Sequence, residues 1–135
     1  MLPWCHPLEL AHYCRPTLGK GNIDAIIIHV GTNCLASDDP DTIAKDVQEI
    51  VKVCKEYGIN DIFVSGITYR EYFENEILNF NNFLMSSQSY HNFTFISNEN
   101  IIISDLWKDR IHLNENGLSK IANNFIKAMK RRFPA

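Results

Sequence analysis

The chain has 135 residues, of which 45% are hydrophobic and 21% are charged, values typical of a globular protein with one buried core. Its formal net charge of -3 excludes a general electrostatic attraction to nucleic acid or to an anionic membrane. No apolar run reaches the length of a transmembrane helix, and the N-terminus lacks the basic start of a signal peptide. We therefore expect a single domain over residues 1–135, located in the cytoplasm or the nucleus.

The four cysteines predict neither a disulfide framework nor a metal site. They form no CxxC pair, and reduced thiols are the rule in cytoplasmic and nuclear proteins. The N-terminal segment does carry four residues with metal-ligand chemistry, but their spacing matches no compact zinc motif. These residues are Cys5, His6, His12 and Cys14.

The first half of the chain predicts a helix, a strand and a second helix. Leu8 to Tyr13 has the composition of a short helix that ends before Pro16. Residues 25–30 form a nearly continuous apolar run rich in β-branched residues, which is typical of a strand buried inside a parallel sheet. Residues 38–41, Asp-Asp-Pro-Asp, predict a helix start with an aspartate cap and a proline in the first turn. The expected inner face of that helix comprises Ile43, Val47, Ile50, Val51 and Cys54.

The second half of the chain continues this alternation. Residues 61–65 predict a buried strand, and residues 71–85 carry apolar side chains at helical spacing. A third strand is expected over 93–96, with 101–103 as an ambiguous extension. Asn114 is expected to cap the last helix. The inner face predicted for that helix comprises Leu118, Ile121, Ala122, Phe125 and Met129.

The alternation of strands and helices predicts an α/β fold in which parallel strands are joined by right-handed crossovers. In such open sheets, functional residues gather in the crevice beyond the carboxyl ends of the strands. The turn Gly31-Thr-Asn33 directly follows the first predicted strand. We therefore expect the polar side chain of Asn33 to point into that crevice.

Asp109 and His112 form the most suggestive acid–base pair in the sequence. They lie three residues apart in the predicted loop before the last helix. One turn at this spacing lets the carboxylate accept a hydrogen bond from the near nitrogen of the imidazole, which leaves the far nitrogen free to act as a base. The alternative is a surface pair that helps to start the helix, and the spacing alone does not decide between the two.

Three segments, taken together, resemble the SGNH hydrolases, also called GDSL-type esterases. These segments are His29-Val-Gly-Thr-Asn33, Val64-Ser-Gly-Ile67 and Asp109-Arg-Ile-His-Leu-Asn-Glu-Asn-Gly117. They look like the esterase domains carried by some retrotransposons and their domesticated relatives. The resemblance extends over most of the chain, and the segments follow the family's order.

This resemblance implies a flavodoxin-like fold of three layers, α/β/α, with a mostly parallel sheet. It also implies hydrolysis of acyl or acetyl esters by a Ser-His-Asp type mechanism that acts on a small ester substrate. Asn33 matches the asparagine whose amide donates to the oxyanion, His112 matches the general base, and Asp109 matches the residue that orients the base. The family resemblance implies no metal and no cofactor.

The sequence departs from the family at several positions. It contains no Gly-Asp-Ser block, so it offers no residue for the family's nucleophile. Trp4 stands where the family has a glycine whose backbone N–H is the second oxyanion donor, and a tryptophan restricts the backbone there. Cys34 stands where aspartate is usual, and Arg110 stands where a small residue is common.

These departures predict a chain that is truncated at its N-terminus and lacks the family's first, central strand. We expect the strand at 25–30 to have an unpaired edge, which a partner chain or a second copy would cover. Without a nucleophile, His112 has no hydroxyl to activate, so catalysis should be lost or impaired. The alternative is a non-catalytic interaction module derived from the same fold. The negative net charge argues against a direct role in nucleic-acid binding.

Several other reactive residues have simpler interpretations. Cys34 and Ser65 each follow a predicted strand. We interpret Cys34 as a small buried filler of the core and Ser65 as a turn residue, rather than as nucleophiles. His29 is expected to be a hydrogen-bonded core histidine inside its strand. A basic run in the last turns of the final helix suits the helix dipole and a solvated helix end. It comprises Lys127, Lys130, Arg131 and Arg132.

Overall fold

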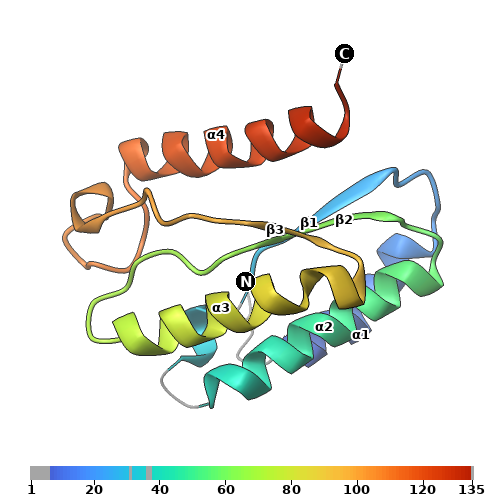
Figure 1. Ribbon diagram of the computed structural model, residues 1–135, viewed down its shortest axis with the longest axis horizontal. Helices are drawn as coiled ribbons and strands as arrows, with labels where there is room; N and C mark the ends of the chain where they lie inside the picture. Colours follow the sequence, from blue (N-terminus) through green and yellow to red (C-terminus); the bar gives the residue numbers. More distant parts are fainter. Residues whose placement is uncertain (1–6, 31, 36–37, 135) are drawn as a thin grey trace.

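The computed structural model describes residues 7–30, 32–35 and 38–134. At its centre lies a sheet of parallel strands in the order β1-β2-β3. The strands are β1 (Ala25–Ile28), β2 (Asp61–Ser65) and β3 (Thr94–Ile96). Because all the pairings are parallel, the carboxyl ends of the strands lie on the same rim, at the left in Figure 1.

Helices cover both faces of this sheet, as Figure 1 shows. The helices are α1 (Pro7–Leu18), α2 (Pro40–Glu56), α3 (Glu74–His91) and α4 (Glu115–Arg132), and the short 3-10 turns are η1 (Thr32–Cys34) and η2 (Ile103–Asp105). Helices α1 to α3 lie on one face and α4 lies on the other, which confirms the predicted three-layer α/β/α arrangement. None of the helices in the described ranges combines the length and apolar character needed to cross a membrane.

The core lies mainly between the sheet and α2 and α3. All five residues predicted for the inner face of α2 are buried, and the core side of α3 is formed by Phe80 and Leu84. In β2, Ile62 and Val64 belong to this core cluster, while Phe63 lines a cavity beneath α4. Side chains therefore leave the central strand on both faces, as expected for a strand enclosed by two layers.

The predicted bounds of two helices are wrong. Helix α1 does not end before Pro16 but continues to Leu18. A proline in the last turn removes only one late hydrogen bond, and the turn is closed by Gly19, whose N–H donates to the Arg15 carbonyl oxygen at 2.8 Å. Helix α3 starts at Glu74 rather than near residue 71, because Tyr72 adopts a left-handed conformation with a φ of 70°.

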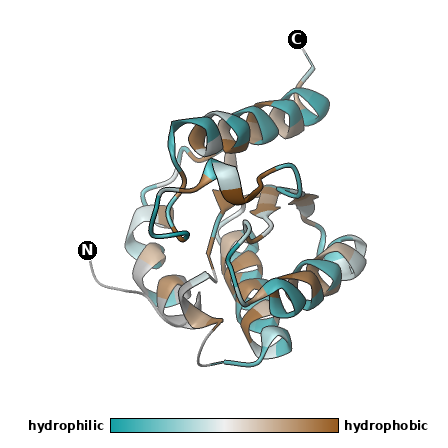
Figure 2. Cartoon of the chain, turned by 90° about the vertical axis from the view of Figure 1, so that its left-hand side faces the viewer, coloured by the Kyte–Doolittle hydropathy of each residue, from teal (hydrophilic) through white to brown (hydrophobic). Residues whose placement is uncertain are grey.

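The predicted inner face of α4 is also partly wrong. Leu118 is 56% exposed and Ala122 is exposed as well, whereas Gly117 and Ile121 are buried. The reason is the docking of Gly117: a Cβ on this residue would lie 2.4 Å from the Asp105 carbonyl oxygen, so the first turn sits directly on the η2 backbone. Figure 2 shows the resulting helix, with much of its outward surface hydrophilic.

The two outer edges of the sheet differ. At the β3 edge, the Phe95 N–H points away from β2 and donates to Oε1 of Gln88 at 3.0 Å. A side chain from α3 therefore covers this backbone donor. At the other edge, β1 pairs with β2 alone among the described residues. The segment 101–103 adds no strand, because the Ile101 N–H donates to the Asn98 carbonyl oxygen and the chain turns into η2.

The close packing of Gly117 generates a prediction about stability. Alanine normally favours a helix over glycine by about 1 kcal/mol, but here its methyl group would collide with the backbone of Asp105. We expect Gly117→Ala to destabilise the fold by about 2 kcal/mol, within the range for overpacked sites. Urea unfolding followed by circular dichroism measures the change. Ser119→Ala, at an exposed position of the same helix, is the control and should be neutral or slightly stabilising.

Candidate functional site

Asp109 and His112 form a hydrogen-bonded pair in the loop before α4. Nδ1 of His112 lies 2.5 Å from Oδ2 of Asp109, which fits a ring N–H that donates to the carboxylate. The other carboxylate oxygen accepts the backbone N–H groups of Ile111 at 2.9 Å and of His112 at 3.1 Å. Both oxygens of Asp109 therefore bind the residues that follow it, and the imidazole is held in one orientation.

The loop that carries this pair is closed by backbone hydrogen bonds. The Trp107 N–H donates to the His112 carbonyl oxygen at 2.8 Å, and the Arg110 N–H donates to the Trp107 carbonyl oxygen at 2.9 Å. Arg110 has a φ of 59°, a left-handed conformation that is disfavoured for a residue with a Cβ. The surrounding hydrogen bonds hold this residue in place, so the sharp turn between Asp109 and His112 is enforced rather than loose.

The base of the loop is anchored to α4. Asp105 is buried, and its carboxylate accepts hydrogen bonds from the Ile102 N–H at 2.9 Å and from Nζ of Lys120 at 2.7 Å. These two contacts lower the pKa of Asp105, with the backbone hydrogen bond as the larger cause. Asn114 caps the helix as predicted, with its side-chain oxygen accepting the Gly117 N–H at 3.0 Å. The Asp109–His112 turn therefore stands on a fixed platform.

The charge state of Asp109 follows from its contacts. The hydrogen bond from His112 is the largest cause, followed by the backbone N–H groups of Ile111 and His112, and together they lower the pKa of Asp109 to about 2. The carboxylate is thus ionised at neutral pH and suited to hold a protonated imidazole. The side chain of His112 is 77% exposed, and Nε2 makes no hydrogen bond with the described residues. This nitrogen is open to solvent and can accept a proton.

The loop after β2 connects the two turns in which the sequence predicts site residues. Nη1 of Arg70 donates to the Thr32 carbonyl oxygen at 2.7 Å, and Oε1 of the next residue, Glu71, accepts a hydrogen bond from Nη1 of Arg110 at 2.6 Å. The η1 turn and the Asp109–His112 loop are therefore both attached to consecutive residues on the same rim. Sequence reasoning missed Arg70 and Glu71, because contacts across 38 and 39 positions leave no local pattern.

Two of the predicted site residues are described only in part or not at all. The backbone of Asn33 belongs to η1, directly after β1, but its side chain lies outside what the structure describes. Trp4 lies outside the described residues altogether. The roles assigned to Asn33 and Trp4 as oxyanion donors therefore stay predictions.

A second polar cluster joins the ends of the strands beneath α4. Ser65 is almost fully buried, and its Oγ lies 2.8 Å from Nδ1 of His29 and 2.7 Å from Nδ2 of Asn98, which donates to it. His29 is hydrogen-bonded as predicted, but the prediction of a core residue inside the strand is wrong, because His29 lies just beyond β1 and is exposed. Desolvation by the surrounding protein lowers the pKa of His29. The ring packs edge-on against Phe125 at 6.3 Å, so this cluster links the strand ends to α4.

The cysteines behave as structural residues. Cys14, Cys34 and Cys54 form no disulfide within the described part of the chain, and Cys34 is 1% exposed, as expected for a buried filler. Burial raises the pKa of the Cys54 thiol to about 11, so it stays protonated at neutral pH. Of the four N-terminal residues with ligand chemistry, Cys5 and His6 lie outside the described residues, and the described part of the chain contains no group of three or more candidate metal ligands.

Comparison with known proteins identifies the fold. No protein-family description and no curated protein matches the chain. Among solved structures, it is similar to an acetyl esterase mutant with acetate ion, with a TM-score of 0.79 and 15% identity over 96% of this chain and 70% of the other. It is also similar to a mutant of the esterase AlinE4, with a TM-score of 0.57 and 13% identity over 96% of this chain and 72% of the other. The chain therefore has an esterase-like fold.

The hydrogen bonds to Asp109 generate a prediction about pH. Because they favour the carboxylate, its folded pKa of about 2 lies below the ordinary 3.8. Their contribution to stability is therefore present above pH 3.8 and is lost as the pH falls through about 2. We expect His112→Ala to move the Asp109 pKa upward, measured by carboxyl ¹³C NMR titration. His91→Ala, in α3, is the control, and an Asp109 midpoint unchanged by His112→Ala would contradict the assignment.

Proposed function

We propose that these residues form the acid–base half of an SGNH-type ester hydrolase site, of the kind found in retrotransposon-associated esterase domains. The observation that carries the proposal is the Asp109–His112 pair: a hydrogen-bonded carboxylate and imidazole, directly before the last helix of an esterase-like fold. The exposed Nε2 of His112 faces solvent, as a general base requires. The proposed substrate is a small acyl or acetyl ester.

In the proposed mechanism, His112 is the general base and Asp109 is its orienting partner. Nε2 of His112 takes the proton of an attacking serine hydroxyl, and Asp109 stabilises the imidazolium that results. The same proton is then given to the departing alcohol, so the histidine returns to its neutral form. The amide of Asn33 and the backbone N–H of Trp4 would donate to the oxyanion. The step needs no metal or cofactor.

We further propose that the 135 residues by themselves are impaired as a catalyst. The sequence contains no Gly-Asp-Ser block to supply the hydroxyl that His112 would activate. Neither alternative nucleophile takes its place, because Ser65 and Cys34 are each 1% exposed. The Ser65 hydroxyl is also already hydrogen-bonded to His29 and Asn98. An ester carbonyl cannot reach either atom without displacing the core.

This proposal predicts the result of an esterase assay. Purified residues 1–135 should hydrolyse p-nitrophenyl acetate no faster than an equal concentration of free imidazole, without saturation by substrate. His112→Ala should change this background no more than His91→Ala does, because neither histidine has a nucleophile to assist. Saturable turnover that His112→Ala removes and His91→Ala keeps would show that the chain has a working nucleophile and would refute the impairment.

A non-catalytic interaction module is the second candidate function, and the edge of β1 that no described strand covers favours it. Beside this edge, α4 and β1 enclose an apolar groove of about 410 Å³. Its lining comprises Ile27, Phe125, Ile126, Met129, Lys130 and Phe133. We propose that a second copy of the chain covers it, because an antiparallel pairing of two β1 edges is self-complementary about a two-fold axis.

The interaction module predicts a dimer that depends on the groove. Ile126 is 49% exposed, so Ile126→Lys should leave the fold intact and place a charge in the interface. Leu118→Lys, at a 56% exposed position of the same helix away from the groove, is the matched control. Analytical ultracentrifugation should show a dimer for the unmodified chain and for Leu118→Lys, and a monomer for Ile126→Lys. An unmodified chain that is monomeric at all concentrations would exclude this mode.

A further inference from the structure

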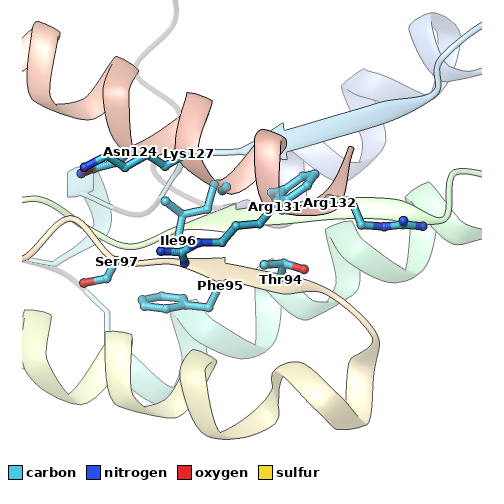
Figure 3. A pocket seen from close by; sticks show the side chains of 10 residues that line it. Thr94, Phe95, Ile96, Ser97, Asn124, Lys127, Arg131 and Arg132 are labelled. Atoms are coloured by element: carbon cyan, nitrogen blue, oxygen red, sulfur yellow. The ribbon is translucent and has the colours of Figure 1, made fainter. Parts of the chain in front are cut away.

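A basic cavity separates α4 from β3, far along the helix from the Asp109–His112 turn. Its volume is about 410 Å³, within the range of small-molecule sites. The sheet side consists of Phe63, Thr94, Phe95, Ile96 and Ser97, and the helix side consists of Asn124, Lys127, Ala128, Arg131 and Arg132. Figure 3 shows the cavity between the helix above and the strand below, with the ring of Phe95 on the far side of the strand, toward α3. The lining contains three cationic residues and no carboxylate, in a protein of net charge -3.

The three cations of this cavity are not equivalent. Nε of Arg132 forms an ion pair with Oδ1 of Asp61 at 2.5 Å, so its charge is already balanced. In Figure 3 the side chain of Arg131 extends the opposite way, along β3 toward Ser97. Within the described residues, no carboxylate forms an ion pair with Arg131 or Lys127. Two unbalanced positive charges therefore line the same cavity.

The positions of these cations distinguish a site from an ordinary basic helix end. Lys127 and Arg131 are four residues apart, so they lie on one face of α4, and this face is turned toward β3. Lys130 belongs to the same basic run but lines the groove on the β1 side of the helix. The helix dipole attracts cations to the last turn on any face. It does not explain why two of them converge over a cavity.

The remaining walls supply polar and apolar surface. Thr94 and Ser97 are exposed and bring hydroxyl groups to the sheet side. Asn124 is held in place by Asn98, whose Oδ1 accepts its side-chain N–H at 3.0 Å. Phe63 and Ala128 add apolar surface. A ligand that fits must therefore combine an oxygen-rich anion with a small organic group.

We propose that this cavity binds a small phosphate monoester. A monoester carries nearly two negative charges at neutral pH, which match the two unbalanced cations, and its oxygens accept hydrogen bonds from hydroxyl groups. The guanidinium of Arg131 can bind two phosphate oxygens side by side, while Lys127 acts as a point charge. The cavity is larger than a phosphate group needs, and the organic part of the ester occupies the space beside Phe63 and Ala128.

The test is titration of the 135-residue chain with phenyl phosphate, followed by ¹⁵N NMR chemical shifts. Saturable shifts should cluster on β3 and on the last turns of α4. Lys127→Gln and Arg131→Gln should each weaken binding about tenfold, as expected for one charge-assisted contact. Lys130→Gln removes the same charge from the same helix end outside the cavity and should change binding less than about twofold. Inorganic phosphate should bind more weakly than phenyl phosphate, and phenol should not bind.

Three results would overturn the proposal. An absence of saturable shifts with phenyl phosphate would exclude the site. An equal loss of affinity in Lys130→Gln and Lys127→Gln would show diffuse attraction to the helix end instead of a bound ligand. Binding to phosphatidylcholine vesicles that contain phosphatidic acid, without binding to phenyl phosphate, would indicate contact with a membrane surface. None of these readouts depends on ester hydrolysis, so the proposal stands or falls independently of the esterase site.

Discussion

The enclosure of β2 between two helical layers is the constraint on which the rest of the structure depends. Ile62 and Val64 pack toward the core formed with α2 and α3, while Phe63 faces α4. A strand buried on both faces must have its backbone groups paired on both sides, and here it has a parallel neighbour at each edge. Parallel pairing brings every strand's carboxyl end to one rim. The turns that carry the candidate site follow from that geometry.

The parts of the fold that could be predicted from sequence are those encoded by local periodicity. The inner face of α2 and the bounds of β2 are correct because each is a short, uninterrupted pattern of apolar residues. The inner face of α4 is partly wrong because the docking of Gly117 on the Asp105 carbonyl, a tertiary contact, sets the rotation of the helix. Local pattern specifies that a helix forms, and packing decides which side it presents.

The candidate site, too, has a part that local sequence predicts and a part that depends on tertiary contacts. The spacing of Asp109 and His112 predicts their hydrogen bond, because one turn is enough to bring them together. The attachment of this turn to the η1 turn through Arg70 and Glu71 has no counterpart in any local pattern.

At the other end of α4, the i and i+4 spacing of Lys127 and Arg131 is visible in the sequence. Only the cavity opposite them distinguishes these residues from a solvated helix end. With 18 residues at about 1.5 Å each, α4 keeps the two sites roughly 20 Å apart.

The contact between Gln88 and β3 has a consequence for assembly. Thr94 and Ile96 direct their backbone groups toward β2, so Phe95 carries the outward N–H of this short strand, and the amide of Gln88 occupies it. Among the described residues, the β1 edge is the one without a neighbouring strand or side chain on its backbone, so the pairing of two β1 edges proposed above would leave a β3 edge, with Gln88 on it, at each end of the joined sheet. Such a pair would hinder the continued addition of strands that leads to fibrils, because the Phe95 N–H at each outer edge already has a hydrogen-bond partner.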